Sequence, residues 1–195
     1  MTETFLVPVG HDLGPWPGAG PGEFCFHVRA GDQVLQLDNL RFAVWLLAHD
    51  GAPPRRAAVL AAAEALGVDA EQAGAALEGL LADGLVAEIA PGTARAFAER
   101  HRLVPLMLGL RPDADDTDLR IVGLLDVPVV QVSAALYDLW LWAHLSADLW
   151  MACTEAAGPA TPDAVLSEVL VAVHPLLASR AAYLDRVLDR VEVAA

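Results

Sequence analysis

Cys25 and His27 are the residues whose types and spacing come closest to supporting chemistry. Residues 24–29 alternate as a β-strand does, so both side chains would lie on one face, as a nucleophile and base or two metal ligands could. The sequence contains no second ligand pair at metal spacing, no phosphate-binding loop, and no GxSxG or HExxH motif. Strand packing is therefore the better explanation and a small thiol enzyme the weaker one, and we expect no catalytic residue, metal or cofactor.

A dense aromatic group between residues 137 and 150 could instead serve recognition. Trp142 and Trp150 are candidates for docking a partner, because exposed aromatic side chains are frequent anchors of interfaces. Trp140 is expected in the core, and core packing is the competing interpretation for the other two.

The segment that carries these tryptophans has a counterpart earlier in the chain. Residues 34–49 and 129–144 match at a constant offset of 95, with six identical positions of sixteen. One of them pairs Trp45 with Trp140, and Leu-Val-Pro also occurs at both residue 6 and residue 103. A repeat of this length predicts two units of one design. We expect Trp45 and Trp140 to be buried at equivalent places, and two copies favour a binding scaffold over a single catalytic pocket.

Composition narrows the class of partner. The 26 acidic residues outnumber 12 basic ones, all arginine, and give a formal net charge of −14. Such a surface repels nucleic-acid phosphates and anionic lipids and suits basic partners. No signal peptide is evident, the apolar stretch near Trp140 is interrupted by charge, and neither Cys25 nor Cys153 belongs to a CxxC motif. We expect a cytoplasmic protein with two free thiols, no bound nucleic acid and no membrane.

Turn and helix signals place the elements of the first copy. Residues 10–22 are rich in glycine and proline and predict a loop. Strands over 24–29 and 34–37 flank a tight turn, Asp38 or Asn39 caps a helix to about residue 49, and Asp69 caps the third helix. The expected series is hairpin, helices over 39–49, 53–66 and 69–83, and a strand over 85–89.

The second copy begins near Leu103 and follows the same plan at first. Strands are expected near 104–109, 119–125 and 128–132, and helices near 133–145, 147–157 and 162–178, with Pro175 kinking or breaking the last. In place of a closing strand we expect more helix, with an apolar stripe of Leu184, Val187, Leu188 and Val191.

This order is typical of winged helix-turn-helix modules. The sequence predicts a helix-rich α+β protein of two tandem winged helix-turn-helix-like modules with short antiparallel β-hairpins. The expected divisions are a first module over 1–92, a linker helix over 93–102, and a degenerate second module with a C-terminal helix over 103–195.

Charge argues against DNA as the partner of these modules. The helix over 69–83 would enter the groove, yet it carries four carboxylates and no basic residue. A tandem winged-helix transcription regulator is the alternative function. It would need a joint basic surface formed by Arg29, Arg41, Arg55 and Arg56.

Residues 24–89 carry a set of short motifs in a fixed order. They are the hairpin, Leu37-Asp38 entering a helix with Trp45-Leu46-Leu47, then Asp50-Gly51, and Gly84-Leu85-Val86 after an acidic-start helix. In these features the segment resembles the PqqD-like winged-helix family, also called the RiPP recognition element. That family binds leader peptides during the modification of ribosomally made peptides.

The resemblance implies that a peptide adds as a strand to the hairpin edge and packs its side chains against the third helix. The site would then comprise Val34, Leu35, Gln36, Gln72, Ala75, Ala76, Gly79 and Asp83. Small residues on that helix would let a peptide backbone approach closely, although alanines that only favour helix explain them as well. The implied function is a non-catalytic accessory protein that binds a precursor peptide, a modifying enzyme or both, and either a homodimer or a heterodimer is compatible with it.

Overall fold

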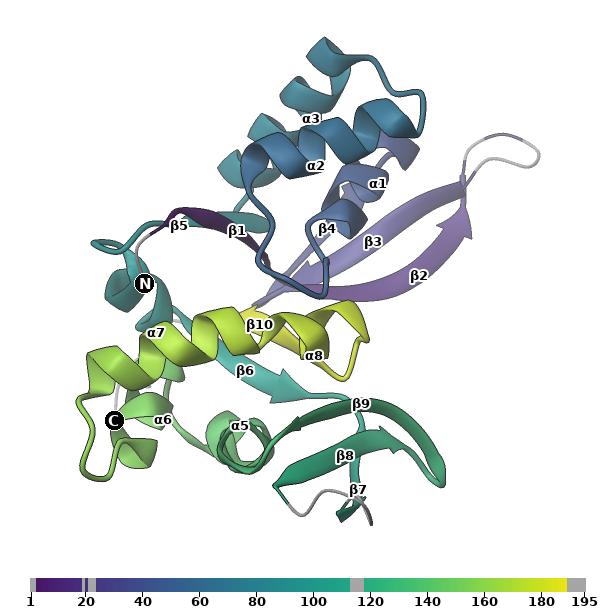
Figure 1. Ribbon diagram of the computed structural model, residues 1–195. Coiled ribbons are helices and arrows are strands. Elements are labelled where there is room, and N and C mark those ends of the chain that lie inside the picture. The colour runs from purple at the N-terminus through teal and green to yellow at the C-terminus, as the bar shows by residue number, and fades with distance from the viewer. Residues whose placement is uncertain (1–2, 19, 21–23, 113–117, 189–195) are drawn as a thin grey trace, which may run out of the picture.

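The computed structural model describes residues 3–18, 20, 24–112 and 118–188. The chain is an α+β protein with small antiparallel sheets, and its first half forms a helical layer beside a long twisted hairpin (Figure 1). The elements of this half are β1 (Phe5–Pro8), β2 (His11–Pro17), β3 (Phe24–Ala30), β4 (Gln33–Leu37), α1 (Asn39–Leu47), α2 (Arg56–Ala65), α3 (Ala70–Ala82) and β5 (Val86–Ile89).

The second half repeats this order after a short connecting helix. Its elements are α4 (Ala94–Ala98), β6 (His101–Pro105), β7 (Leu108–Pro112), β8 (Leu119–Leu124), β9 (Val127–Ser133), α5 (Ala134–Trp142), the 3-10 turn η1 (Ala143–Leu145), α6 (Leu149–Ala156), α7 (Pro162–Ala172), α8 (His174–Ala178) and β10 (Ala182–Arg186).

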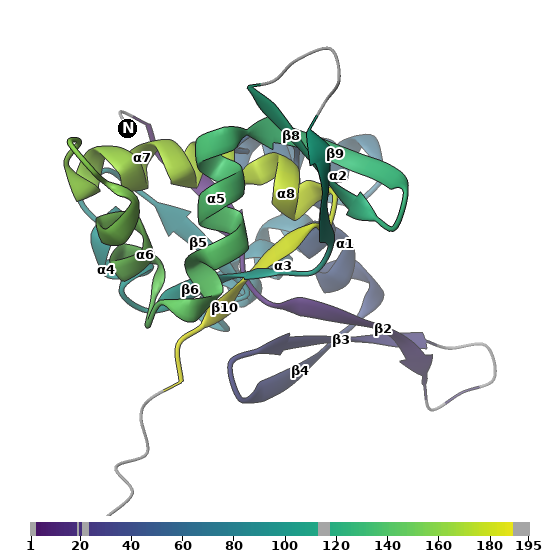
Figure 2. The same cartoon turned by 90° about the horizontal axis from the view of Figure 1, so that it is seen from below.

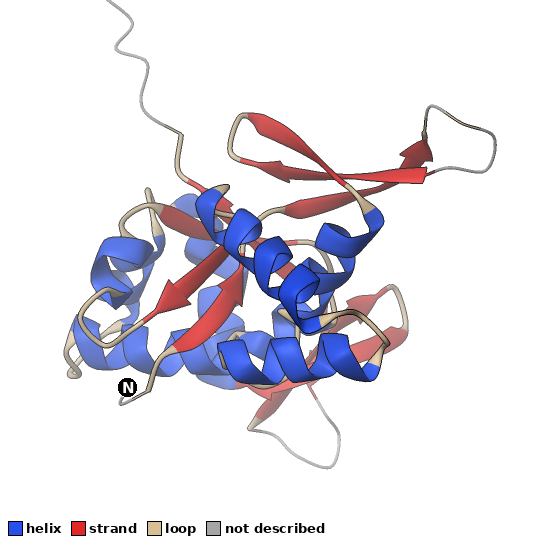
Figure 3. Ribbon diagram, turned by 90° about the horizontal axis from the view of Figure 1, so that it is seen from above, coloured by secondary structure: helices blue, strands red, loops and turns tan. Residues whose placement is uncertain are grey.

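Strand pairing is the same in both halves. In the first, β1 pairs with β5 and a separate sheet has the order β2-β3-β4. In the second, β6 pairs with β10 and a separate sheet has the order β7-β8-β9. All pairs are antiparallel, and the two three-stranded sheets project from a body in which helices surround the short central strands (Figure 3).

The two matched tryptophans occupy equivalent places in the two halves. Trp45 and Trp140 are 2% and 1% exposed, as the repeat predicts. The indole N–H of Trp45 donates to the carbonyl of Leu85 at 3.1 Å, and that of Trp140 donates to the carbonyl of Ala181 at 3.1 Å. Each indole therefore ties the first helix after the sheet to the start of the closing strand.

Each of these two carbonyls comes directly after the end of a helix, and the two helices end with the same backbone geometry. Gly84 and Arg180 have φ values of 62° and 57°, in the left-handed region. The next N–H bonds back to the carbonyl of Leu80 in one case and Leu176 in the other, which is the Schellman arrangement. Glycine takes this conformation without cost, whereas Arg180 must be held in it by its surroundings.

The closing strand β10 corrects our expectation of a C-terminal helix. Residues 182–186 pair with β6, so Leu184 lies in a strand and not on a helical stripe; Val191 lies outside the described residues. Four of the five β10 residues are buried, and one of them is charged. Only Leu184 of the expected stripe lies in β10, and Ala182 to Asp185 form the continuous buried run of a strand enclosed on both faces.

The strand β2 corrects a second expectation, the loop over residues 10–22. His11–Pro17 pairs with β3 at the outer edge of its sheet, with a register shift between Asp12 and Pro15. Pro15 and Pro17 are tolerated because a strand at the edge of a sheet needs only half of its backbone groups for pairing. Glycine and proline thus marked an irregular edge strand here.

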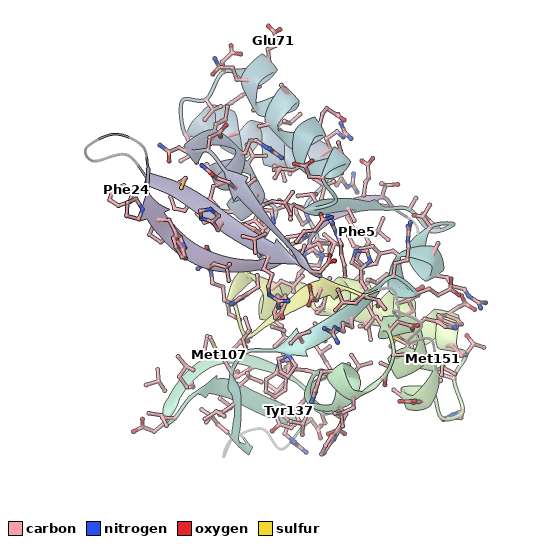
Figure 4. The ribbon with its side chains drawn as sticks, turned by 180° about the vertical axis from the view of Figure 1, so that it is seen from behind. Phe5, Phe24, Glu71, Met107, Tyr137 and Met151 are labelled. Carbon is pink, nitrogen blue, oxygen red and sulfur yellow. The ribbon has the colours of Figure 1, made fainter. Side chains whose placement is uncertain are left out.

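The two halves share one hydrophobic core. Buried side chains from both form a single cluster, and Phe5 of β1 lies edge-on to His174 of α8 at 5.7 Å. Figure 4 shows Phe5 in the middle of the molecule, between the two halves. Leu77, which helical spacing on α3 placed in the core, is fully buried.

Helix starts and stops follow the sequence signals closely. Asp38, Asp69 and Thr161 each accept a hydrogen bond from a backbone N–H in the first turn of their helix. The expected break at Pro175 is present, because α7 ends at Ala172 and α8 begins at His174. Among the described residues, every helix is too short or too polar to traverse a bilayer.

The cap at Asp69 allows a first test. Its carboxylate accepts from the N–H groups of Glu71 and Gln72. Asp69→Ala should lower the free energy of unfolding by about 1 kcal/mol, because two N–H groups at the start of α3 lose their acceptor. Urea denaturation measures the loss, and Glu71→Ala, which removes no cap, should cost less. Equal losses for the two variants would contradict the role of the cap.

Candidate functional site

The edge strand β4 carries part of the expected peptide site. Within the described residues no strand pairs with its outer side. Val34 is 55% exposed and Gln36 is exposed, while Leu35 is half-buried on the opposite face. The register pairs Arg29 with Val34 and His27 with Gln36, so these four side chains share the solvent face of the sheet.

The expected site residues on α3 are only partly accessible. Gln72 and Ala75 are exposed near the start of the helix, which lies at the outer tip of the helical layer, where Figure 4 labels Glu71. Ala76, which we expected on the open face, is 6% exposed and packs in the core. The small residue there serves close packing of α3, so that part of the expected surface was wrong.

The end of α3 and the start of β4 meet through an arginine that the sequence did not single out. The guanidinium of Arg186 donates to the backbone carbonyl of Asp83 and to the side-chain oxygen of Gln33 at 3.4 Å. Asp83 itself forms an ion pair with Arg41, whose guanidinium lies over Gly79. Gly79 and Asp83 therefore lie near the β4 end of the helix, but arginines already cover them.

Cys25 and His27 do share one face of β3, as alternation predicts. The thiol of Cys25 donates to the backbone carbonyl of Trp16 at 3.7 Å, and the ring of His27 stands edge-on to Trp16 at 5.4 Å. These contacts are those of a packed sheet face. Burial raises the pKa of the other thiol, Cys153, to about 12, which keeps it protonated and unreactive.

The four arginines that a DNA-binding surface would need are all paired with acids. Arg29 lies 3.4 Å from Asp185, and Arg41 pairs with Asp83. Arg55 pairs with Glu3, and Arg56 pairs with both Glu78 and Glu88. Carboxylates thus offset each positive charge locally, and no joint basic surface forms from these residues.

A cleft of about 550 Å³ lies in the second half, where it is lined by α5, α6 and α7. Its floor is apolar and formed by Leu139, Ala152 and Val169, which are at most 7% exposed. The residues of α5 and α7 that line it recur at spacings of three and four, as on one face of a helix. Figure 2 shows α5 in front of this group of helices, with α6 and α7 behind and to one side.

The rim of this cleft is acidic. Asp138, Glu155 and Glu168 come from the three different helices and are all exposed. Glu155 accepts a hydrogen bond from the hydroxyl of Ser146 at 2.8 Å. In the part of the chain that the structure describes, no arginine or histidine pairs with any of the three.

The two candidate docking tryptophans lie in different surroundings. Trp142 is 59% exposed and lines the cleft. Trp150 is half-buried, and the guanidinium of Arg95 stacks over its ring at 4.3 Å from the centroid. Trp142 therefore remains available to a partner, whereas Trp150 is engaged within the chain by a cation–π contact.

The two halves differ in the packing of their helices around the position of this cleft. In the first half α1 packs directly on α3, and Arg41 on α1 reaches Asp83 at the end of α3. The position of Arg41 corresponds to Leu136 in the second copy, which cannot form that bridge. The third helix of the second half is also broken before Pro175, and α7 does not pack on α5 as closely as α3 packs on α1.

The described residues contain no group of three or more His, Cys, Asp or Glu side chains placed to hold a metal ion. Sequence reasoning found Trp142 but missed the cleft and its carboxylates, because only the packing of three helices brings them together. The helical spacing of Asp138 with Trp142 on α5 was the one available signal. No family model, curated protein or solved structure matches this chain.

Proposed function

We propose that this protein is a non-catalytic adaptor that binds a polypeptide as an added strand on β4 and presents it to a modifying enzyme. The order of strands and helices in each half is the reason to treat both as winged-helix-like modules. The resemblance of residues 24–89 to leader-peptide-binding modules is the reason to name a precursor peptide as the ligand.

The observation that carries this proposal is the distribution of proline over the outer strands of the two three-stranded sheets. Three of these four strands contain proline: β2 at Pro15 and Pro17, β7 at Pro112, and β9 at Pro128. Proline has no N–H, so an outer strand that contains it pairs poorly with a further strand. The remaining outer strand, β4, has none.

The hairpin geometry also leaves the backbone of β4 open for pairing. Ala30 and Gln33 flank the two-residue turn, and Gly31 has a φ of 64°. In such a hairpin the flanking pair exchanges hydrogen bonds and the pattern alternates from there. The N–H and C=O groups of Val34 and Gln36 therefore point to the outer edge, where an added peptide strand would bond.

Charge favours this ligand over nucleic acid. The net charge of −14 repels phosphates, and the arginines of a regulator's basic surface are paired with carboxylates. Basic residues in a peptide would meet no such repulsion. The tandem winged-helix regulator is accordingly the weaker function.

Val34→Pro tests the proposal directly. A peptide selected on the wild-type protein from a display library of random short peptides serves as the ligand, and calorimetry measures its affinity. The variant should bind it at least about 10-fold more weakly, because proline removes an outward N–H without disturbing the β3–β4 ladder.

Val129→Pro is the matched control, since the repeat aligns Val129 with Val34 and Val129 lies on β9, an outer strand that already carries Pro128, at a register shift in its pairing with β8. This variant should keep the wild-type affinity, and circular dichroism should show that both variants are folded. A selected peptide that binds Val34→Pro as tightly as wild type would refute the site, as would a library that yields no ligand.

A further inference from the structure

We infer that the cleft between α5, α6 and α7 is a docking groove for an amphipathic helix of a partner polypeptide whose apolar face is flanked by lysine or arginine. The groove lies in the second half, on elements separate from β4. The inference therefore stands independently of the peptide strand proposed above.

The shape and floor of the cleft suit an apolar ligand face. A volume of about 550 Å³ is within the range of sites that bury ligand side chains. Leu136, Leu139 and Val169 offer apolar surface at its base, and small residues at Ala135 and Ala172 lower its walls. Trp142 stands exposed at one side, where it can cover the apolar face of a bound helix.

The charge of the rim decides the chemistry of the occupant. Asp138, Glu155 and Glu168 surround the opening, and no described basic side chain offsets them. A partner with cations on both sides of its apolar face would pair with them, whereas an acidic partner would be repelled. The corresponding space of the first half is closed by the packing of α1 on α3 and by the Arg41–Asp83 ion pair.

The walls favour a helix over an extended strand. The residues that line the cleft come from α5, α6, α7 and the turn after α5, apart from Ser133, which ends β9 and caps α5. The walls are therefore helix faces and not the length of a strand edge. An extended peptide would lose hydrogen bonds from its backbone to water without finding partners there. A helix satisfies its own backbone groups and presents side chains at helical spacing to the groove.

The test uses two fluorescein-labelled helices, one of leucine and lysine and one with glutamate in place of lysine. Fluorescence anisotropy at moderate salt should show that the wild-type protein binds the lysine helix at least about 10-fold more tightly than the glutamate helix. Asp138→Lys with Glu168→Lys should reverse this preference. Trp142→Ala should weaken binding of the lysine helix by about 5-fold or more.

The matched control is Glu64→Lys with Glu71→Lys, which changes net charge equally at exposed sites of the first half. It should shift the affinity by less than about 2-fold, and Val34→Pro should bind the lysine helix normally. Ala172→Phe, which fills the exposed mouth of the cleft without changing charge, should also weaken binding. Equal binding of the two helices, no binding of either, or cleft variants that behave as wild type would overturn the inference.

Discussion

Asp185→Ala should lower the free energy of unfolding by about 2–4 kcal/mol, because this carboxylate is fully buried and holds the two halves together. It accepts the backbone N–H of Gly31 at 2.7 Å and lies 3.4 and 3.5 Å from the guanidinium groups of Arg29 and Arg102. The alanine variant leaves the N–H without a partner and both arginines without their counter-ion. The arginine side chains are 35% and 37% exposed, so water offsets part of the loss.

Chemical denaturation of two variants checks this expectation. Asp185→Asn keeps an oxygen for Gly31 but removes the charge, and its loss should be smaller than that of alanine. Glu99→Ala breaks the exposed pair with Arg95 and should cost less than about 1 kcal/mol. If Asp185→Ala cost no more than Glu99→Ala, the buried ion pair would not be what joins β10 to the β3–β4 turn.

Unfolding should become easier as the pH falls from 7 to 5, and His174 should supply much of the change. The side chain is fully buried beside Phe5, and burial lowers its pKa from 6.5 to about 4. Neither ring nitrogen makes a hydrogen bond of normal geometry within the described residues, although Asp50 lies close enough to favour protonation. Burial similarly lowers the pKa of His49 and of His101 to about 4.

The sign of this pH dependence follows from whether the folded or the unfolded chain binds a proton more tightly at each histidine. The unfolded chain protonates near pH 6.5 and the folded chain only near 4, so the stabilisation is complete above 6.5 and is lost as the pH falls toward 4. At pH 5 the loss from His174 alone should be about 2 kcal/mol. His49 and His101 act in the same direction.

His174→Leu isolates this contribution. Its stability difference between pH 7 and pH 5, measured by urea denaturation, should be smaller than that of wild type by about 2 kcal/mol, whatever the variant's stability at pH 7. His144→Gln is the control, because His144 is exposed and stays in water in both states. A pH dependence unchanged by His174→Leu would contradict the prediction, because it would show that this ring has the same pKa in the folded and the unfolded chain.

Local sequence determined much of the first half. The hairpin of β3 and β4, the helices α1 and α3 with their caps at Asp38 and Asp69, and the closing strand β5 lie where turn, cap and periodicity signals predict them, whereas α2 begins at Arg56, three residues later than expected. The repeat placed Trp45 and Trp140 correctly in the core. These features depend on contacts between residues close in sequence, or on a pattern that occurs twice in the chain.

Tertiary structure decided what local pattern could not. The sequence of β10 has the apolar content of a buried helix or of a buried strand, and only its pairing with β6 settles which it is. The local sequence of β2 predicts a loop, and its pairing with β3 makes it a strand. The local sequence predicts an exposed Ala76, and the packing of α3 against the core buries it.

The candidate sites divide in the same way. The sequence by itself determined an acidic chain, a duplicated plan and a proline-free strand at β4. Only the tertiary structure brought Asp138, Glu155 and Glu168 around one cleft and placed Asp185 between the halves. These residues are far apart along the chain, and the packing that joins them leaves no local signature because each helix could carry an acidic residue on its surface for solubility alone.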